Sequence, residues 1–415
     1  MNFYLNKYGF LPPQIIEDPK SDLGIVVVIP CFNEPDLISS LNSLVQCKLP
    51  HASVEVIIVV NSGEHHSVEI LRQNQRTIAE YKLWKDQTNS EIDFHLIHVP
   101  DLPKKHAGVG LARKIGMDEA VARFETLKKE GIIVCFDADS SCDQNYLTEI
   151  EDHFKRNPET PGCSIYFEHP IDGDEFGNEI YSGIINYELH LRYYNQALNF
   201  VGLPYAFHTV GSSMAVRSSI YQKQGGMNKR KAGEDFYFIH KIIALGGFTE
   251  LNTTRVIPSP RISDRVPFGT GKAIGDWVDE GKLEYLTYNF QSFIDIKHFV
   301  DLIPSLYESK EIDLADIPEK MKKFLLDNGI YKAINEAKIH STSYTSFLKR
   351  FFVWFDAFLV LKLVHFLRDE VYVNQPITIE VSKLFVQNSW GNTEMKVIDQ
   401  LDQLRMIERS ISDQD

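Results

Sequence analysis

Two aspartates at the end of a short apolar run are the side chains best placed for chemistry in this chain. Residues 132–136 read Ile-Ile-Val-Cys-Phe, a run that predicts a buried strand of a parallel sheet. Asp137 and Asp139 follow it, and residues two apart in an extended chain point to the same side. Open α/β sheets bind ligands just beyond the carboxyl ends of their strands. The pair therefore predicts a Mg²⁺ or Mn²⁺ site that is shared with phosphate oxygens.

The Asp-x-Asp spacing is common, so its position decides its meaning. It occurs three times in this chain, at 137–139, 172–174 and 413–415. The second lies in a polar, glycine-containing stretch that predicts a turn, and the third is at the end of the sequence. Only the first follows an apolar run. The alternative interpretation of that pair is a capped turn between a strand and a helix.

A second pair of carboxylates opens a predicted helix. Glu234 and Asp235 precede isoleucines at 239, 242 and 243, whose spacing is helical. Either carboxylate could act as a general base in a pocket. Adjacent helical residues diverge by about 100°, so the two need not share a role. The alternative is that both only favour the dipole at the amino end of the helix.

Arginines in two glycine-containing segments could bind phosphate. Arg113 follows Gly108 where a basic loop leads into a predicted helix, and a guanidinium can bind phosphate in a fork. Arg261 and Arg265 lie in the loop 258–271, which is too long for a simple connection and predicts a lid that closes on phosphates. The alternative for Arg113 is an ordinary surface residue of the helix.

The elements that would position these residues form a doubly wound α/β sheet. Apolar runs at 25–29, 54–60 and 132–136, with an alternating run at 94–99, predict strands that are separated by helices. The turn at 30–35, Pro-Cys-Phe-Asn-Glu-Pro, lacks the Gly-x-Gly-x-x-Gly pattern, and no Gly-Lys-Ser/Thr phosphate loop occurs. We therefore expect neither a classical dinucleotide site nor a triphosphate-binding loop of that kind.

Composition narrows the class of protein. The 415 residues are 43% hydrophobic and carry a formal net charge of −14, with a pI of about 5.5. General nucleic-acid binding needs a basic face, so this acidic chain is not expected to bind nucleic acid. The five cysteines include no Cys-x-x-Cys pair, which indicates a reducing compartment rather than a disulfide framework.

We expect a cytoplasmic protein with three parts along the chain. The amino terminus lacks the pattern of a signal peptide. The apolar stretch 351–367 is shorter than the about 20 residues of a spanning helix and predicts a buried helix, with a dimer face or membrane association in the plane of the bilayer as alternatives. The expected parts are an amino-terminal arm at 1–23, an α/β domain at 24–285 and a helical region of unknown role at 286–415.

Taken together, the motifs resemble those of the family 2 glycosyltransferases with the GT-A fold. The resemblance covers about residues 24–275 and rests on motifs in the family's order. These are Pro30-x-Phe32-Asn33-Glu34, Gly108 with Ala112-Arg113-x-x-Gly116, Asp137-x-Asp139, the stretch from Gly211 to Arg217, and Glu234-Asp235. The resemblance implies a mostly parallel sheet flanked by helices, and transfer of a sugar from a nucleotide-linked donor.

The resemblance also implies which residues bind the nucleotide and the metal. Pro30, Phe32 and Glu34, in the turn after the first strand, would contact the nucleotide. Asp137 would lie near the ribose or the metal, and Asp139 would coordinate Mn²⁺ or Mg²⁺.

The base and the diphosphate depend on further residues. Many members of the family read the base with an aspartate at the end of the second strand, where this chain has Asn61. An amide can both accept and donate a hydrogen bond, so UDP- and GDP-linked donors both stay open. Arg113, Arg261 and Arg265 are the candidates for diphosphate contact, the last two by position and charge more than by a family motif.

For the reaction, the resemblance implies that Asp235 is the general base and that Glu234 supports it or contacts the acceptor. We expect a metal-dependent, inverting transfer in a single displacement. The acceptor would be a hydroxyl of a glycan, a lipid-linked glycan or a small molecule. The alternatives are a retaining GT-A transferase, a nucleotidyltransferase that makes the activated sugar, and a non-catalytic nucleotide-binding scaffold.

Overall fold

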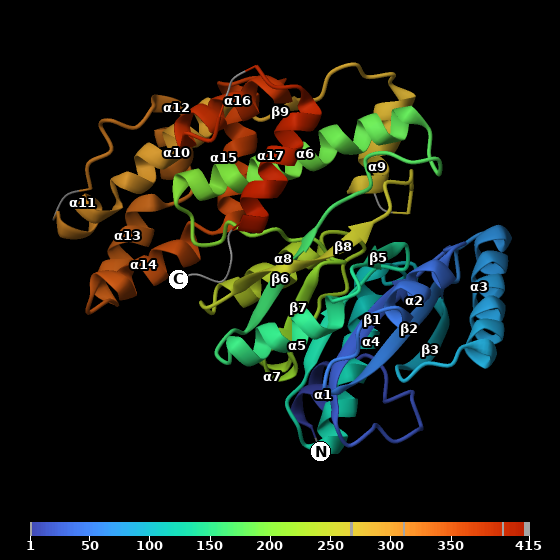
Figure 1. Ribbon diagram of the computed structural model, residues 1–415. Helices are drawn as coiled ribbons and strands as arrows, with labels where there is room; N and C mark the ends of the chain where they lie inside the picture. The colour runs from blue at the N-terminus through green and yellow to red at the C-terminus, as the bar shows by residue number, and fades with distance from the viewer. Residues whose placement is uncertain (1, 266–268, 310–311, 392–393, 411–415) are drawn as a thin grey trace. The chain divides into compact units, whose positions relative to one another are not determined.

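The computed structural model describes residues 2–265, 269–309, 312–391 and 394–410, and the chain forms two compact units (Figure 1). The first unit takes residues 1–181, 209–276 and 407–415, and the second takes residues 182–208 and 277–406. The two units are defined by the contacts that residues make within the folded chain. The domain bounds predicted from the sequence, 24–285 and 286–415, divide the chain by role and stay a prediction.

The first unit is built on an eight-stranded sheet with the order β3-β2-β1-β4-β7-β6-β8-β5. Neighbours among β1 to β4 pair in parallel, as do β6 and β8, whereas β7 and β5 run antiparallel to their neighbours. The fold class predicted from the sequence is therefore confirmed. The strands are β1 (Leu23–Cys31), β2 (Ser53–Gly63), β3 (Asp93–Leu102), β4 (Ile132–Cys135), β5 (Ser140–Cys142), β6 (Gly162–Phe167), β7 (Met214–Arg217) and β8 (Thr249–Pro258).

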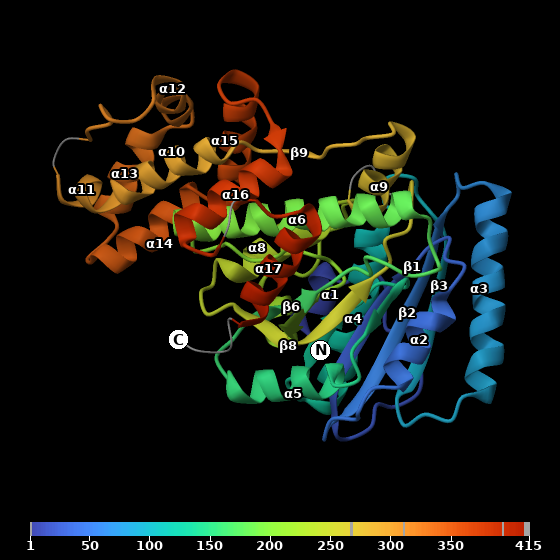
Figure 2. The same cartoon turned by 45° about the horizontal axis from the view of Figure 1, so that its top comes forward.

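Helices cover both faces of the parallel part of this sheet. Figures 1 and 2 show α2 (Leu37–Val45) and α3 (Val68–Gln87) on one face and α4 (Val109–Leu127) on the other, as right-handed crossovers require. Helix α4 packs closely on β1, where a Cβ on Gly116 would lie 2.4 Å from Cγ1 of Val28. The other helices within this unit are α1 (Phe3–Tyr8), α5 (Tyr146–Arg156), α7 (Ser218–Lys223) and α8 (Glu234–Ile243).

The amino-terminal segment is held against helix α4. Tyr4 in α1 is buried, and its hydroxyl donates a hydrogen bond to Oδ1 of Asp118 at 2.7 Å. Further along, the backbone N–H of Gln14 donates to Oε2 of Glu119 at 2.7 Å. The arm predicted at residues 1–23 thus supports the helix that also carries Arg113.

The second unit is mainly helical and has an aromatic core. The ring of Phe299 lies 6.2 Å from that of Phe351 and 5.2 Å from that of Phe355, and all three side chains are buried. Its helices and its short antiparallel strand pair are α10 (Phe290–Asp301), α11 (Ile303–Glu308), α12 (Glu319–Asp327), α13 (Ile330–Ile339), α14 (Tyr344–Trp354), α15 (Ala357–Glu370), α16 (Ile377–Asn388), β9 (Leu286–Thr287) and β10 (Gln375–Pro376). Helices α6 (Asn178–Val201), α9 (Thr270–Asp279) and α17 (Val397–Ser410) contribute residues to both units.

The apolar stretch 351–367 is two helices, so the prediction of one continuous helix is wrong. Helix α14 ends at Trp354, and the carboxylate of Asp356 accepts a hydrogen bond from the N–H of Leu359 at 2.8 Å. An aspartate in this position caps the start of a new helix, here α15. No helix in the described ranges is long and apolar enough to cross a membrane.

Candidate active site

Polar side chains gather at the carboxyl ends of β1, β2 and β4. Strand β1 pairs in parallel with both of the others, so the turns that follow these strands lie at the same edge of the sheet. Glu34 follows β1, Asn61 lies near the end of β2, and Asp137 and Asp139 follow β4. Open α/β sheets bind ligands at such an edge.

A buried arginine holds the first group of charges, the Arg113 cluster, which comprises Arg113, Asp137, Glu234 and Asp235. Nη2 of Arg113 donates to Oδ1 of Asp137 at 2.7 Å, and Nη1 donates to Oε1 of Glu234. A Cβ on Gly211 would lie 2.9 Å from both Nη atoms and 3.0 Å from Oδ2 of Asp235. The side chain of Arg113 is only 2% exposed, so its interpretation as a surface residue is wrong.

One guanidinium faces three carboxylates in this cluster, which leaves it with an excess of negative charge. Burial raises the pKa of Glu234 to about 7, although Arg113 opposes the change. Burial also raises the pKa of Asp137 and of Asp235, again against the effect of Arg113. Burial alone would lower the pKa of Arg113, but Asp137 and Glu234 raise it overall. Such a site favours holding a proton or binding a cation.

The two carboxylates at the start of α8 have different surroundings. Glu234 pairs with Arg113, whereas Oδ1 of Asp235 accepts a hydrogen bond from the N–H of Phe236 at 2.7 Å. Gly233, with φ of 68°, turns the chain into the helix. Asp235 therefore stabilises the helix start through one oxygen, and its other oxygen lies beside Gly211. Adjacent helical residues are expected to diverge in this way.

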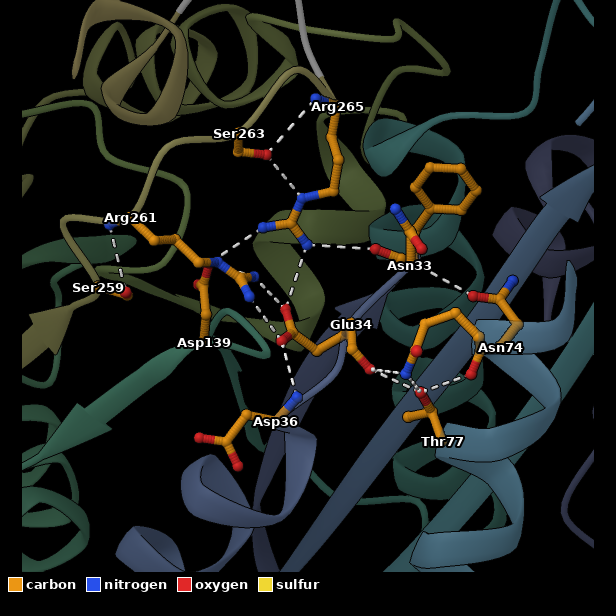
Figure 3. Close-up of polar contacts among 12 residues, drawn as sticks. Asn33, Glu34, Asp36, Asn74, Thr77, Asp139, Ser259, Arg261, Ser263 and Arg265 are labelled. Carbon is orange, nitrogen blue, oxygen red and sulfur yellow. Dashed lines mark hydrogen bonds and ion pairs between the residues drawn. The ribbon is translucent and has the colours of Figure 1, made fainter. Parts of the chain in front are cut away.

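The second group of charges, the Arg261 cluster, comprises Glu34, Asp139, Arg261 and Arg265 (Figure 3). Arg261 donates to Oδ2 of Asp139 from Nε at 3.0 Å and from Nη2 at 2.7 Å, and to Oε1 of Glu34 from Nη1 at 2.8 Å. Arg265 reaches the same carboxylates at 3.1 and 3.2 Å. Two cations here balance two carboxylates, and Glu34 is fully buried.

The segment 258–271, predicted as a lid, is described except for three residues. Residues 266–268 lie outside the described residues. In the described part, Arg265 is oriented by the hydroxyl of Ser263, which accepts from its Nε at 2.9 Å (Figure 3). Both arginines of the segment therefore point to the carboxylates that follow β1 and β4.

Sequence reasoning missed the polar residues of α3 that hold the turn after β1. Oδ1 of Asn74 accepts a hydrogen bond from the N–H of Asn33 at 2.9 Å, and Oγ1 of Thr77 donates to the carbonyl of Glu34 at 2.6 Å (Figure 3). Nδ2 of Asn74 also donates to the carbonyl of Asn61 at 3.1 Å. Asn74 thus joins the turn after β1 to the end of β2. The side chains of Asn74 and Thr77 are both buried. The sequence of α3 is mostly polar, so its hydrophobic periodicity does not indicate this burial.

The end of β2 offers a hydrogen-bond acceptor that has no partner in the described structure. Asn61 is 2% exposed, and its Nδ2 donates to the carbonyl of Gly108 at 3.2 Å. Its Oδ1 is buried without a hydrogen bond among the described residues. In the turn after β1, the ring of Phe32 lies 4.6 Å from the ring of His66. Pro30 lies inside β1, buried, and pairs with β2.

The aspartates of the Asp-x-Asp motif fit a divalent cation that binds together with phosphate. Arg113 donates to Oδ1 of Asp137, and Arg261 and Arg265 donate to Oδ2 of Asp139. The other oxygen of each aspartate has no hydrogen-bond partner among the described residues. Mg²⁺ is commonly held by one or two carboxylates, waters and substrate phosphates. The described residues include no group of three or more His, Cys, Asp or Glu that could hold a metal ion. They therefore fit a shared cation and not a cage of protein ligands.

Comparison with known proteins gives one family match, which covers part of the first unit. Residues 26–225 match the family model described as "Glycosyl transferase family 2". A search of curated proteins finds no match. Among solved structures, the chain is similar to S. aureus TarS 1–349 in complex with UDP-GlcNAc, with 11% identity, a TM-score of 0.40, and coverage of 94% of this chain and 91% of that chain. The complex of TarS 1–349 with UDP gives 12% identity, a TM-score of 0.39 and the same coverage.

Proposed function

We propose that the protein, whose residues 26–225 match the model of glycosyl transferase family 2, transfers a sugar from a nucleoside diphosphate to a hydroxyl acceptor with inversion of configuration. The Arg113 cluster is the observation that carries the proposal. One buried guanidinium brings the motif aspartate Asp137 together with Glu234, and Asp235 lies beside it at Gly211. The carboxylates proposed to act on the donor and on the acceptor thus surround the guanidinium of Arg113.

The turns after β1 and β2 would bind the nucleotide. The buried Oδ1 of Asn61 needs a donor, and the ring N–H of uracil or of guanine can supply one. Phe32 offers an aromatic face for the base and Glu34 a carboxylate in the same turn, while Pro30 lies buried in the strand that leads there. The donor is therefore a UDP- or GDP-linked sugar in this proposal.

Charge on the departing diphosphate would be met by a divalent cation and by arginines. Asp137 and Asp139 would hold Mn²⁺ or Mg²⁺, which when bound supplies positive charge at the phosphate oxygens. Arg261 and Arg265 bind Asp139 in this structure, and the same guanidinium forks suit a diphosphate. Arg113 would act from the buried side by holding Asp137 in place.

Asp235 would take the proton from the acceptor hydroxyl. Inversion requires this base on the face of the sugar opposite the leaving diphosphate. The raised pKa of Asp235 makes the carboxylate a stronger base than an ordinary aspartate. Glu234, paired with Arg113, would hold the start of α8 in position next to the proposed donor site.

Location and further partners belong to the same proposal. All five cysteines are free, which supports action in a reducing compartment such as the cytoplasm. The acceptor would be a glycan, a lipid-linked glycan or a small molecule. Contact with a membrane surface or with a second copy through residues 351–367 would use the apolar Val353, which is 71% exposed.

A thermal-shift screen with Mn²⁺ and a panel of nucleoside diphosphates tests the donor and metal site. A ligand that binds only the folded protein raises its melting temperature. We expect one diphosphate to stabilise the protein with metal, and chelator or Asp139→Ala to remove that shift. Asp174→Ala, in the exposed Asp-x-Asp segment, should keep it. If no nucleotide shifts the melt in any metal, the donor site is wrong.

The stereochemistry has its own test. NMR of the sugar product reads the anomeric configuration, and inversion relative to the donor is expected. A retained configuration would contradict the role given to Asp235 while leaving the donor site intact.

A further inference from the structure

Five exposed cations lie in the loops that precede α4 and α8, and we call them the basic rim. They come from two segments far apart in sequence. One carries Lys104 and Lys105 before α4, and the other carries Lys229, Arg230 and Lys231 before α8. Within the described residues none of the five forms an ion pair.

Backbone packing brings the two segments together beside the carboxylates of α8. A Cβ on Gly108 would lie 3.0 Å from Cα of Lys231, and a Cβ on Gly110 would lie 2.2 Å from the carbonyl oxygen of Arg230. The same position on Gly110 would be 3.1 Å from Cβ of Glu234. The two glycines therefore let the second basic segment lie against the first turn of α4. This second segment therefore lies beside the first turn of α8, which carries Asp235.

Aromatic contacts hold part of the rim while its charges stay in solvent. The Nζ atom of Lys229 lies 5.2 Å from the ring centre of Phe10, and the guanidinium carbon of Arg230 lies 3.8 Å from that of Tyr237. Such contacts fix long side chains without neutralising them. Lys229 and Arg230 thus present positive charges that form no ion pair with the described residues.

We propose that the basic rim binds an acceptor that carries phosphate or carboxylate groups. This inference rests on the proposed function, because it names the acceptor class for Asp235. In the proposed function the donor diphosphate already has Arg261, Arg265 and a divalent cation at the sheet edge. The five positive charges of the basic rim would add nothing to the binding of a neutral acceptor. They would attract and orient an anionic acceptor.

Equilibrium binding without donor tests the rim directly. The probes are a phosphorylated maltooligosaccharide, its unphosphorylated parent and anionic phosphatidylglycerol vesicles. The full chain should bind the phosphorylated sugar about tenfold more tightly than the parent, and the preference should fall as salt rises. The double variant Lys229→Gln/Lys231→Gln should lose the preference for the phosphorylated sugar. The control variant Lys82→Gln/Lys223→Gln removes the same charge from exposed sites elsewhere and should keep this preference.

The outcomes separate this inference from the donor site. Equal binding of both sugars, or a preference that survives in the rim variant, overturns the acceptor class. Tight binding to vesicles with no preference between the sugars also overturns it and marks a membrane surface. Weaker nucleoside diphosphate binding in the rim variant with an unchanged sugar preference would assign the rim to the donor instead. Failure of the proposed function shows separately, as a lack of any diphosphate-induced thermal shift.

Two thiols meet where α2 and β5 lie side by side, and this observation is independent of the rim. Sγ of Cys47 lies 3.6 Å from Sγ of Cys142. Cys47 also donates to the carbonyl of Ser43 at 3.4 Å, and Cys142 lies 3.8 Å from the Ser43 hydroxyl. The contact with Cys142 lowers the pKa of the Cys47 thiol, although burial opposes this change. A lower pKa favours the reactive thiolate.

We also infer that Cys47 and Cys142 form a reversible disulfide. Side-chain rotation must shorten the sulfur separation to the about 2.05 Å of a disulfide. The Cys47 thiolate attacks a small-molecule disulfide such as oxidised glutathione and releases one thiol. Cys142 then attacks the mixed disulfide and releases the second, so two protein thiols are oxidised and one disulfide is reduced. The bond would tie α2, which follows Glu34, to β5, which follows Asp139.

Peptide mapping of the native full chain after treatment with oxidised glutathione tests this pairing. We expect one internal cross-link between Cys47 and Cys142, and a melting temperature that rises on oxidation and returns with dithiothreitol. Cys47→Ser should abolish both effects and Cys163→Ser should preserve them. Stable glutathione adducts without the cross-link, or an unchanged set of five free thiols, would overturn the inference.

Discussion

Arg113 and Glu234 form an ion pair in which both side chains are almost fully buried, 2% and 4% exposed. The second nitrogen of the same guanidinium holds Asp137, which follows β4. Removing one partner from a buried ion pair leaves an unpaired buried charge, which strongly destabilises the folded protein. The start of α8 and the end of β4 are therefore positioned by one residue of α4.

Asp235→Asn should separate chemistry from binding. The amide keeps the size of the side chain but cannot accept the acceptor proton, so kcat should fall by about 10²–10⁴. The Kd for the nucleoside diphosphate should stay within about twofold, because the base does not contact the nucleotide in this proposal. Steady-state kinetics and calorimetry measure the two quantities. Asp174→Asn is the matched control, and turnover like that of the parent in Asp235→Asn would remove Asp235 from the mechanism.

Glu234 should make stability depend on pH in an identifiable way. Its pKa in the folded protein is about 7, above the ordinary value of 4.5, so protonation favours the folded state. Its contribution is therefore full below about pH 4.5 and is lost as the pH rises through about 7. In Glu234→Gln, the fall in unfolding free energy between about pH 5 and pH 8 should shrink, on the order of a few kcal/mol.

Urea denaturation at several pH values measures that difference. Glu91→Gln, at an exposed glutamate, is the control and should follow the parent at every pH. Parallel curves for the parent and Glu234→Gln would mean that Glu234 stays ionised in the folded protein, with Arg113 dominating over burial.

The strands could be predicted because burial leaves a direct trace in the sequence. Strand β1 is buried from Ile25 to Cys31, and such a strand must be apolar on both faces. The Asp-x-Asp motif was identified as a candidate because it follows such a strand, whereas Glu34 was a candidate through the family resemblance of the turn after β1. The break at Asp356 was not predicted, because the apolar pattern continues through it and only the capping hydrogen bond reveals it.

The support of the site was harder to predict than its charged groups. Asn74 and Thr77 lie in a helix whose residues are mostly polar, so a buried asparagine there looks like an exposed one. Likewise, the pairing of Arg261 with Glu34 joins residues 227 positions apart, which no local pattern encodes. The sequence motifs therefore mark the charged groups but not the contacts that fix them.

Asn61→Ala should weaken base recognition more than diphosphate binding. The change removes the buried Oδ1 that lacks a partner, and with it the acceptor proposed for the base N–H. A lost hydrogen bond of this kind is worth about 1–3 kcal/mol. The preference between UDP and GDP should therefore shrink about tenfold, measured by competition binding. An unchanged preference would place base recognition elsewhere.

Asn74→Ala should act on both turns at once and without regard to the base. Asn74 accepts from the N–H of Asn33, whose φ of 49° is unusual for a residue other than glycine, and it donates to the carbonyl of Asn61. Loss of both bonds leaves buried backbone groups unpaired and should lower the unfolding free energy by about 1–3 kcal/mol. Affinity for UDP and for GDP should then fall by the same factor, because the turns lose their mutual position while Asn61 keeps its amide. A changed preference between the two nucleotides would instead show that Asn74 takes part in reading the base.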